Sequence, residues 1–238
     1  MRYKAILFDV DDTLLDFQTG NHNAVNQLMD ELGYHDSDRY EQYEAINLKC
    51  WAELEAGLLT QNQLKLARFV RFFDRYPVAG DPRWAAERFV ELLGRQSILL
   101  PHALETVSRI AQKLPVAIVT NGITAIQRSR LGLSPLKDYV TEVVISEEVG
   151  VSKPRPGIFT IALDRLGVRP SDALMVGDGV NSDIRGANNA GIDACWLNPS
   201  GKPLPEGVRA DYQITDIRQC VEIAMDGIGD GSSFQMVE

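Results

Sequence analysis

An apolar run that ends in three closely spaced carboxylates constrains this sequence more than any other stretch. Residues Ala5–Phe8 are apolar and are followed by Asp9, Asp11 and Asp12, a pattern typical of a buried strand that ends in an acidic turn. Carboxylates this close raise one another's pKa, so Asp9 and Asp11 can stay ionised together only beside a cation or by sharing a proton. Mg²⁺ binds one or two carboxylates with waters and phosphate oxygens, and this turn could begin such a site. An acidic turn that caps a strand or opens a helix needs no metal, and that alternative stays open for this stretch taken alone.

Length, charge and cysteine content limit the class of protein. With 238 residues and 45% hydrophobic content, the chain can bury a large core in one or two domains. A net charge of −9 at pH 7 argues against a basic face that binds a nucleic-acid polymer or an anionic membrane. No run of about 18 apolar residues occurs and no apolar leader precedes the first strand, which predicts a cytoplasmic protein. Cys50, Cys195 and Cys220 are far apart and odd in number, so we expect reduced packing residues.

Residues 20–96 lack strand character and carry the signals of successive helices. Two predicted helices end just before Gly33 and Gly57, and two more begin with capping signals at Thr60 and Asp81. The pattern predicts a helical block that packs around its own aromatic side chains. These are Trp51, Phe69, Phe72, Phe73, Trp84 and Phe89.

From residue 101 onwards, short apolar runs alternate with amphipathic segments. Further strands are predicted at residues 116–119, 143–145, 173–176, 194–197 and 212–214, with helices at 102–113, 124–131, 157–166 and 182–190 between them. This order predicts an α/β fold, a doubly wound parallel sheet with helices on both faces. Such sheets bind ligands beyond the carboxyl ends of their strands. The Gly- and Ser-rich residues 226–238 are predicted to be a flexible tail.

Two of the later strand ends could supply donors to an anion. Thr120, Asn121 and Gly122 offer a hydroxyl, an amide and a backbone that a ligand can approach closely. Lys153 precedes Pro154, which holds its backbone extended and could present its ammonium group to phosphate oxygens. Asn-Gly is also an ordinary turn, and a loop lysine can simply be solvated, so both alternatives stay open for each segment taken alone.

The fourth predicted strand ends in a second acidic segment. Asp178 falls at the end of this strand, and Asp183 falls in the opening of the next helix. Because carboxyl ends of parallel strands meet at one edge of a sheet, both side chains can point toward Asp9 and Asp11.

These four segments together resemble the four motifs of haloacid dehalogenase superfamily phosphatases. The segments Asp9-x-Asp11-x-Thr13, Thr120-Asn121, Lys153-Pro154 and Gly177-Asp178-x₄-Asp183 stand in that family's order and spacing. The resemblance implies a haloacid dehalogenase-like core at residues 1–19 and 97–225, with a helical cap at 20–96 inserted after the first strand. Residues 145–154 and 176–198 further resemble bacterial pyrimidine 5′-nucleotidases, which dephosphorylate nucleoside monophosphates, including non-standard ones.

The resemblance implies a phosphomonoester hydrolase that acts through an aspartyl-phosphate. Asp9 would attack phosphorus, and Asp11 would protonate the leaving group and then activate water. Mg²⁺, or another divalent ion such as Mn²⁺, would be held by Asp9, the backbone carbonyl of Asp11 and Asp178. Asp183 would orient the metal shell from behind or through water.

The resemblance also implies how a small phosphorylated substrate would be held. Lys153 and Thr120, with the N–H groups of Asn121 and Gly122, would bind the equatorial phosphoryl oxygens. The cap would close over the site, exclude water and contact the base. Phe17, Asn47, Trp51 and Arg68 could contact substrate, although each could equally be a packing or surface residue.

Other functions stay open at this point. A haloacid dehalogenase would share the fold, but attack on carbon needs no magnesium and no second acid, so Asp11, Asp178 and Asp183 favour phosphoryl transfer. A non-hydrolytic phosphoacceptor signalling domain also holds an aspartyl-phosphate beside Mg²⁺, but it is shorter and places its phosphoacceptor on an internal strand. A catalytically silent binding protein is a third alternative. Within the phosphatases, sugar-phosphate, phosphoglycolate and acylneuraminate-phosphate hydrolysis are alternatives to nucleotide hydrolysis.

Overall fold

A computed structural model of the chain describes residues 2–226 and divides them into two compact units. The core unit contains residues 2–16, 98–124 and 131–226, and the helical unit contains Phe17–Ser97 and Ala125–Arg130. Residues 227–238 of the predicted tail lie outside the described residues. Asp226, which the tail prediction also included, instead ends helix α10.

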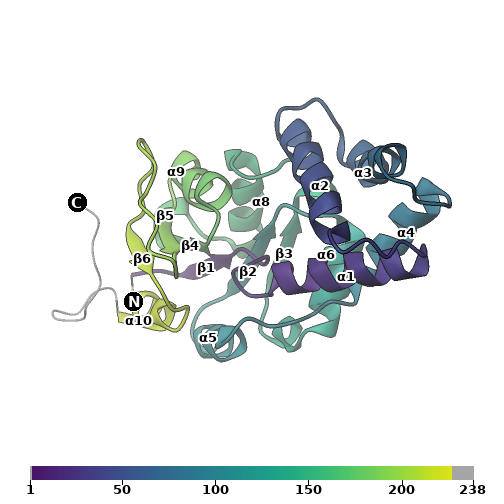
Figure 1. Cartoon of the computed structure of the whole chain (residues 1–238). Helices are drawn as coiled ribbons and strands as arrows, with labels where there is room; N and C mark the ends of the chain where they lie inside the picture. Colours follow the sequence, from purple (N-terminus) through teal and green to yellow (C-terminus); the bar gives the residue numbers. More distant parts are fainter. Residues whose placement is uncertain (1, 227–238) are drawn as a thin grey trace. The chain divides into compact units, whose positions relative to one another are not determined.

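The core unit is built on a six-stranded parallel sheet in the order β3-β2-β1-β4-β5-β6 (Figure 1). The strands are β1 (Ala5–Phe8), β2 (Val116–Thr120), β3 (Glu142–Ile145), β4 (Ala173–Gly177), β5 (Asp193–Leu197) and β6 (Tyr212–Ile214). All residues of β1, β2 and β4 are buried, as expected for strands covered on both faces. The chain builds outward from β1 to β3 and then crosses back to β4, so the strand order reverses between β1 and β4. Ligands bind beside such a reversal.

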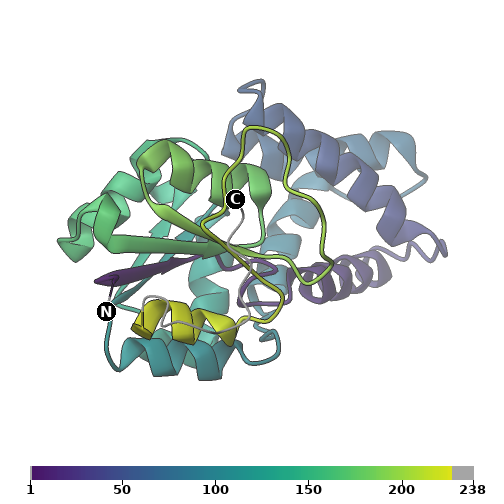
Figure 2. The same ribbon diagram turned by 90° about the vertical axis from the view of Figure 1, so that its left-hand side faces the viewer.

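Helices cover both faces of this sheet, which confirms the predicted doubly wound α/β fold. The helices after residue 98 are α5 (Ala103–Ala111), α6 (Thr124–Leu133), α7 (Ser146–Val149), α8 (Pro156–Leu166), α9 (Arg185–Ala190) and α10 (Gln219–Asp226), with single turns η1 (Pro135–Asp138), η2 (Pro170–Asp172) and η3 (Val180–Ile184). Helices α5 and α10 lie side by side on one face, and α8 and α9 lie on the other (Figure 2). Val107 and Cys220 belong to the first apolar layer, and Phe159 and Ala187 belong to the second.

Two local elements of the core differ from the sequence prediction. The predicted helix at residues 182–190 begins instead as the π-helical turn η3, in which the N–H groups of Asp183 and Ile184 both donate to the Gly179 carbonyl, at 2.7 and 3.3 Å. Such turns are common at functional sites. The four-residue helix α7 was not predicted, because so short an element leaves no helical periodicity in the sequence.

The helical unit contains four successive helices and residues 125–130 of α6. The four helices are α1 (Phe17–Glu31), α2 (Arg39–Glu55), α3 (Gln61–Arg75) and α4 (Pro82–Gly94). Both predicted caps are present: the Thr60 hydroxyl accepts from the Gln63 N–H at 3.2 Å, and the Asp81 carboxylate accepts from the Arg83 N–H at 2.9 Å.

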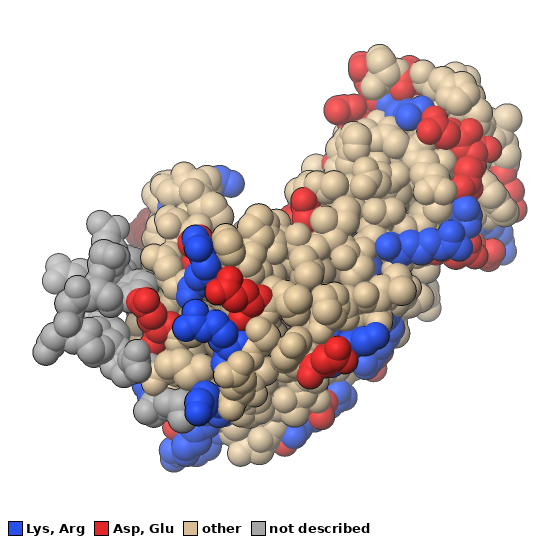
Figure 3. Space-filling model, turned by 90° about the horizontal axis from the view of Figure 1, so that it is seen from below, with Lys and Arg blue, Asp and Glu red and all other residues tan. Residues whose placement is uncertain are grey.

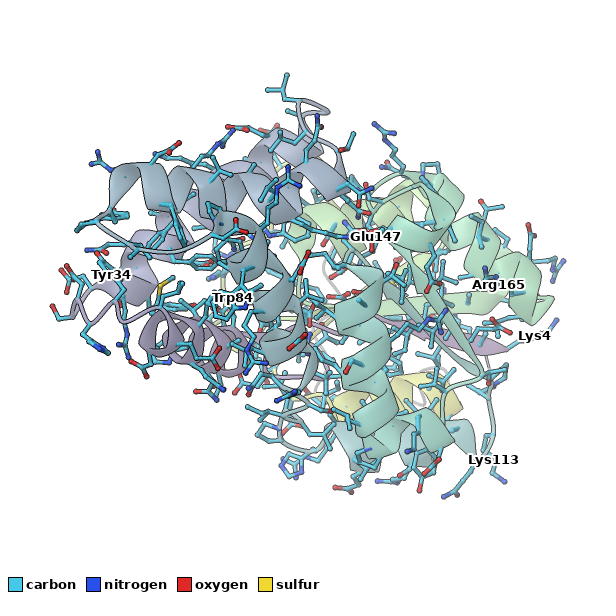
Figure 4. All side chains as sticks on the ribbon, turned by 90° about the vertical axis from the view of Figure 1, so that its right-hand side faces the viewer. Lys4, Tyr34, Trp84, Lys113, Glu147 and Arg165 are labelled. Atoms are coloured by element: carbon cyan, nitrogen blue, oxygen red, sulfur yellow. The ribbon has the colours of Figure 1, made fainter. Side chains whose placement is uncertain are left out.

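Aromatic rings form the centre of the helical unit. Phe69, Phe72 and Phe89 are buried, as predicted, and Tyr43 packs against all three with ring centroids 5.5–6.3 Å away. Trp51 and Phe73 are half-buried, and Trp84 is 43% exposed on the surface of α4 (Figure 4). The prediction was wrong for Trp84 because the buried stripe of α4 runs through Ala85, Phe89, Leu92 and Leu93, one residue out of phase with it.

Two polar residues considered as substrate contacts are buried inside the helical unit. Arg68 donates from Nη1 to the Asn47 side-chain oxygen at 3.2 Å, and its guanidinium lies 4.5 Å from the centroid of the Phe89 ring. A cation over an aromatic face is an attractive contact. This arrangement gives Arg68 a packing role within the helical unit.

The charged surface shown in Figure 3 and the buried cysteines were both considered in the sequence prediction. Basic and acidic side chains are interspersed on the face shown in Figure 3. All three cysteines are buried and unpaired, as packing residues are. Among the described residues, no helix combines the length and the apolar character needed to cross a membrane.

Candidate active site

Three carboxylates converge at the carboxyl edge of the sheet, where the strand order reverses. Asp9 follows β1, Asp178 follows the neighbouring strand β4, and Asp183 lies in η3. The Asp9 N–H donates to the Val176 carbonyl at 3.0 Å, which extends the β1–β4 ladder by one residue. One carboxylate oxygen from each of the three aspartates lies within 4.8 Å of the others, and Asp9 and Asp183 are buried. The structure therefore brings together three of the four acidic residues chosen from the sequence.

Asp11 is not one of the three converging carboxylates, although its charge acts on Asp9. It is half-buried in a tight turn, in which the N–H groups of Leu14 and Leu15 both donate to the Val10 carbonyl at 2.9 Å. Asp12 occupies the left-handed region at φ 59°, a conformation that aspartate tolerates better than most residues. The group of converging carboxylates does not include that of Asp11, whose predicted contribution to the metal is a backbone carbonyl.

Lys153 lies inside the acidic cluster. Its Nζ is 2.6 Å from Asp9 Oδ1 and 2.7 Å from Asp183 Oδ1, and its side chain is 1% exposed. Burial alone would lower the pKa of Lys153, but the Asp183 and Asp9 carboxylates more than offset this and hold it above its usual value. Lys153 is therefore a charged ammonium group in direct contact with two of the three acids.

The Asn121 side chain fixes the backbone of Lys153. Its Nδ2 donates to the Lys153 carbonyl at 2.9 Å, and the Lys153 N–H donates to Asn121 Oδ1 at 2.8 Å. Thr120 is the last residue of β2, and Gly122 follows two residues later. Since β2 pairs in parallel with β1, all three residues lie at the same sheet edge as Asp9. No feature of the sequence indicated that the Asn121 side-chain amide would form hydrogen bonds with the Lys153 backbone.

Asp178 is held by two further residues. Thr13 donates from its hydroxyl to Asp178 Oδ1 at 3.0 Å, and the same hydroxyl oxygen accepts from the Asp178 N–H at 3.2 Å. The indole N–H of Trp196 donates to the Asp178 carbonyl at 3.0 Å. Thr13 belongs to the motif Asp9-x-Asp11-x-Thr13, and Trp196 lies in the resembling segment 176–198. The sequence alone predicted no role for either residue.

One ammonium group cannot neutralise three converging carboxylates. Burial raises the pKa of Asp9 well above its usual value, and repulsion from Asp183 adds to the shift while Lys153 reduces it. Burial, followed by repulsion from Asp183, raises the pKa of Asp178 to about 6. The surplus negative charge and the all-oxygen set of donors fit a hard divalent cation such as Mg²⁺. The cluster could thus hold a metal ion.

The space around Asp183 depends on the absence of a side chain at residue 177. A Cβ on Gly177 would lie 2.5 Å from Asp183 Cγ and 2.7 Å from its Cβ. Gly177→Ala is therefore expected to displace Asp183, to weaken Mg²⁺ binding about tenfold and to lower the free energy of unfolding by about 1–3 kcal/mol. Calorimetric titration and urea unfolding measure the two effects.

Gly132→Ala is the matched control for this substitution. Gly132 lies within α6, and a Cβ there meets nothing within 4 Å. The control should raise the free energy of unfolding by about 0.5–1 kcal/mol and leave Mg²⁺ binding unchanged. Equal Mg²⁺ affinity in the Gly177→Ala variant and the parent would contradict the placement of Asp183.

The fold and this constellation of carboxylates and lysine define the class of the protein. The family model of the haloacid dehalogenase-like hydrolases matches residues 3–191, and the chain belongs to this family. It is 33% identical over 224 residues to pyrimidine 5′-nucleotidase YjjG of Escherichia coli, covering 94% of this chain and 98% of that protein. It is 37% identical over 228 residues to pyrimidine 5′-nucleotidase PynA of Streptococcus pneumoniae, covering 93% and 96%.

Solved structures show the same architecture. The putative HAD-hydrolase YfnB from Bacillus subtilis, solved with bound magnesium, matches with a TM-score of 0.86 at 30% identity and covers 94% of this chain and 100% of that one. L-2-haloacid dehalogenase from Xanthobacter autotrophicus matches with a TM-score of 0.76 at 18% identity, which shows the fold alone. Together the family and its relatives confirm the predicted class of enzyme, a phosphatase of the haloacid dehalogenase-like hydrolases.

Proposed function

We propose that this phosphatase is a Mg²⁺-dependent 5′-nucleotidase that hydrolyses pyrimidine nucleoside monophosphates, including non-standard ones, through an aspartyl-phosphate on Asp9. The observation that carries the proposal is the buried Asp9 carboxylate, held 2.6 Å from Lys153 Nζ and grouped with Asp178 and Asp183. The similarity to YjjG and PynA supports pyrimidine nucleotides as the substrates.

The reaction divides into two displacements at phosphorus. An oxygen of Asp9 attacks phosphorus as the bond to the leaving nucleoside oxygen breaks, and the Asp11 carboxyl group gives its proton to that oxygen. The Asp11 carboxylate then takes a proton from a water molecule, which attacks phosphorus and releases inorganic phosphate from Asp9. Asp11 ends each cycle protonated again, so one acid serves both steps.

The acidic residues would hold the metal beside the nucleophile. Asp9 and Asp178, with the backbone carbonyl of Asp11, are the proposed ligands, and Asp183 positions them directly or through water. Bound Mg²⁺ would neutralise the charge of the phosphoryl oxygens.

The donors at the end of β2 and in the loop after α7 would bind the phosphoryl group. Lys153, Thr120 and the N–H groups of Asn121 and Gly122 are the proposed partners of the equatorial oxygens, where negative charge accumulates in the transition state. The reciprocal hydrogen bonds between Asn121 and Lys153 keep the lysine backbone fixed while its ammonium group acts.

We assign catalysis to the core and choice of substrate to the helical part of the chain. The proposed catalytic core is residues 1–19 and 97–225, and the proposed cap is residues 20–96. Supporting this assignment, the converging carboxylates and Lys153 all belong to the core unit.

A substrate screen tests the proposed function. We expect kcat/KM for UMP, dUMP and dTMP, with Mg²⁺ present, to exceed that for sugar phosphates, phosphoglycolate and phosphoserine at least tenfold, about 1.4 kcal/mol of discrimination. Phosphoserine and N-acylneuraminate-9-phosphate belong in the screen because phosphatases named for them are 29% and 26% identical to this chain. A preference for any of these over the nucleotides would overturn the nucleotidase proposal and leave the proposed chemistry standing.

Binding of Mg²⁺ is expected to weaken as the pH falls. Because the pKa of Asp178 is raised to about 6, protons compete with the metal below this pH, and Asp178 alone should make Mg²⁺ binding about tenfold weaker at pH 5 than at pH 7. The same raised pKa makes the metal-free protein lose stability as the pH rises from about 4 to 6, since ionised Asp178 is disfavoured only in the folded state.

Calorimetric titration and thermal unfolding at pH 5, 6 and 7 measure these two trends. Mg²⁺ should restore stability most strongly at pH 7, and chelation should abolish turnover at every pH. Asp172→Asn, at the opposite end of β4, is the control and should leave the Mg²⁺ profile unchanged. An affinity that stays flat between pH 5 and 7 would contradict the expected protonation of Asp178.

A further inference from the structure

A single peptide group links two of the converging carboxylates and is held at both of its ends. This peptide joins Asp178 to Gly179. Its carbonyl accepts a hydrogen bond from the Trp196 indole N–H at 3.0 Å, and its N–H donates to Asp183 Oδ2 at 2.9 Å. In a trans peptide the C=O and N–H groups point in opposite directions, so these two hydrogen bonds together fix its rotation.

Trp196 is itself held rigidly by the sheet. It lies in β5, where it is in register with Gly177 of β4, and it is 3% exposed. A buried indole N–H requires an acceptor, and the Asp178 carbonyl provides it. The orientation of the Asp178–Gly179 peptide is thereby tied to a residue of the neighbouring strand.

We propose that Trp196 is a positioning residue for the divalent cation site, because its indole N–H sets the orientation of the Asp178–Gly179 peptide and so places the Asp183 carboxylate beside that of Asp178. The inference rests on the proposed metal site of the phosphatase and extends it to a residue that is not among the proposed ligands of the metal or of the phosphoryl group.

Loss of the indole N–H would release this peptide. Gly179 has no side chain to resist a rotation, and the Asp178 carbonyl would be left without its donor. A rotated peptide would turn the Gly179 N–H away from Asp183. Asp183 would then keep its contact with Lys153 Nζ, at 2.7 Å, but its carboxylate would move away from that of Asp178. The expected consequence is weaker metal binding in a protein that still folds.

Two replacements of Trp196 test the inference by calorimetric titration with Mg²⁺. Trp196→Phe removes the donor and part of the ring, whereas 3-benzothienylalanine at this position keeps the indole shape and replaces the N–H by sulfur. Both proteins should bind Mg²⁺ about tenfold or more weakly than the parent, within the range typical of residues that orient metal ligands. Trp84→Phe is the control, since Trp84 is exposed in the helical unit, and it should bind Mg²⁺ like the parent.

Tryptophan fluorescence gives a second readout that does not depend on turnover. The chain contains three tryptophans, so a variant with both Trp51→Phe and Trp84→Phe carries only Trp196. Its emission should shift on titration with Mg²⁺, because the metal polarises the peptide that the indole donates to. The shift should disappear when Asp178→Asn is added.

The outcomes separate this inference from the proposed function. If the parent binds Mg²⁺ and the benzothienyl protein binds it within twofold of the parent, the positioning role of Trp196 is wrong and the metal site stands. If the parent itself does not bind Mg²⁺, both the metal site and the role of Trp196 are wrong. Weaker binding by the benzothienyl protein, with parent-like thermal unfolding in the absence of metal, supports the inference.

Discussion

The Asp9→Asn variant is expected to lose phosphatase turnover by about 10⁴-fold or more while keeping its fold. Asparagine has nearly the shape of aspartate, so the buried site should stay intact, but a neutral amide oxygen does not form the acyl phosphate that the reaction needs. The measurement is kcat for UMP with Mg²⁺ present. Circular dichroism and thermal unfolding report the fold.

Two controls make this result specific. Asp172→Asn removes a carboxylate at the opposite end of β4, where Asp172 accepts hydrogen bonds from Lys4 and Arg169, and it should leave kcat within twofold of the parent. Mass spectrometry must show that asparagine at position 9 has not deamidated to aspartate. Turnover above about one per cent of the parent, with deamidation excluded, would remove Asp9 as the nucleophile.

The Lys153→Met variant should be damaged in both catalysis and stability. Methionine keeps the length of the side chain but leaves Asp9 and Asp183 without the ammonium group that lies 2.6 and 2.7 Å from them. We expect kcat to fall about a thousandfold, as when a transition-state donor is removed, and the free energy of unfolding to fall by about 3 kcal/mol at pH 7. Kinetics with UMP and urea unfolding measure the two losses.

The stability of the Lys153→Met variant, measured as a function of pH and of Mg²⁺ concentration, tests whether repulsion between carboxylates causes the loss. The unpaired carboxylates repel only when ionised, so the loss of stability should grow as the pH rises from about 4 to 7, and Mg²⁺ should recover part of it. The exposed Lys113→Met is the matched control and should change neither property measurably. A Lys153→Met protein with parent-like stability across this pH range would show that the ammonium group does not hold the carboxylates together.

Much of the architecture could be predicted because it depends on local patterns. Apolar runs at 116–119 and 173–176 identified β2 and β4, and the carboxylates after β1 and β4 could be placed together from the rule that parallel strands share a carboxyl edge. Lys153 was chosen for its extended backbone and its place after β3, and the structure brings it to Asp9.

The features that escaped prediction depend on which residues meet across the fold. The contact of Trp196 with Asp178 depends on the register of β5 against β4, and that of Asn121 with Lys153 depends on two loops that are distant in sequence. Tyr43 joined the core of the helical unit because of how α2 meets α3 and α4. No short stretch of sequence encodes these contacts between distant residues, so they can be identified only from the folded structure.

The position of β1 in the sheet has a consequence for biosynthesis. Strand β1, which precedes Asp9, is translated before the other strands of the sheet, yet Ile6 pairs with Val116 on one side and with Leu174 on the other. Both edges of this apolar strand are therefore unpaired until β2 has been translated, and one edge stays unpaired until β4 has been translated. Unpaired edges invite association with other chains. Prematurely terminated products that end before β4 should accordingly need chaperone protection, whereas the completed chain encloses its first strand.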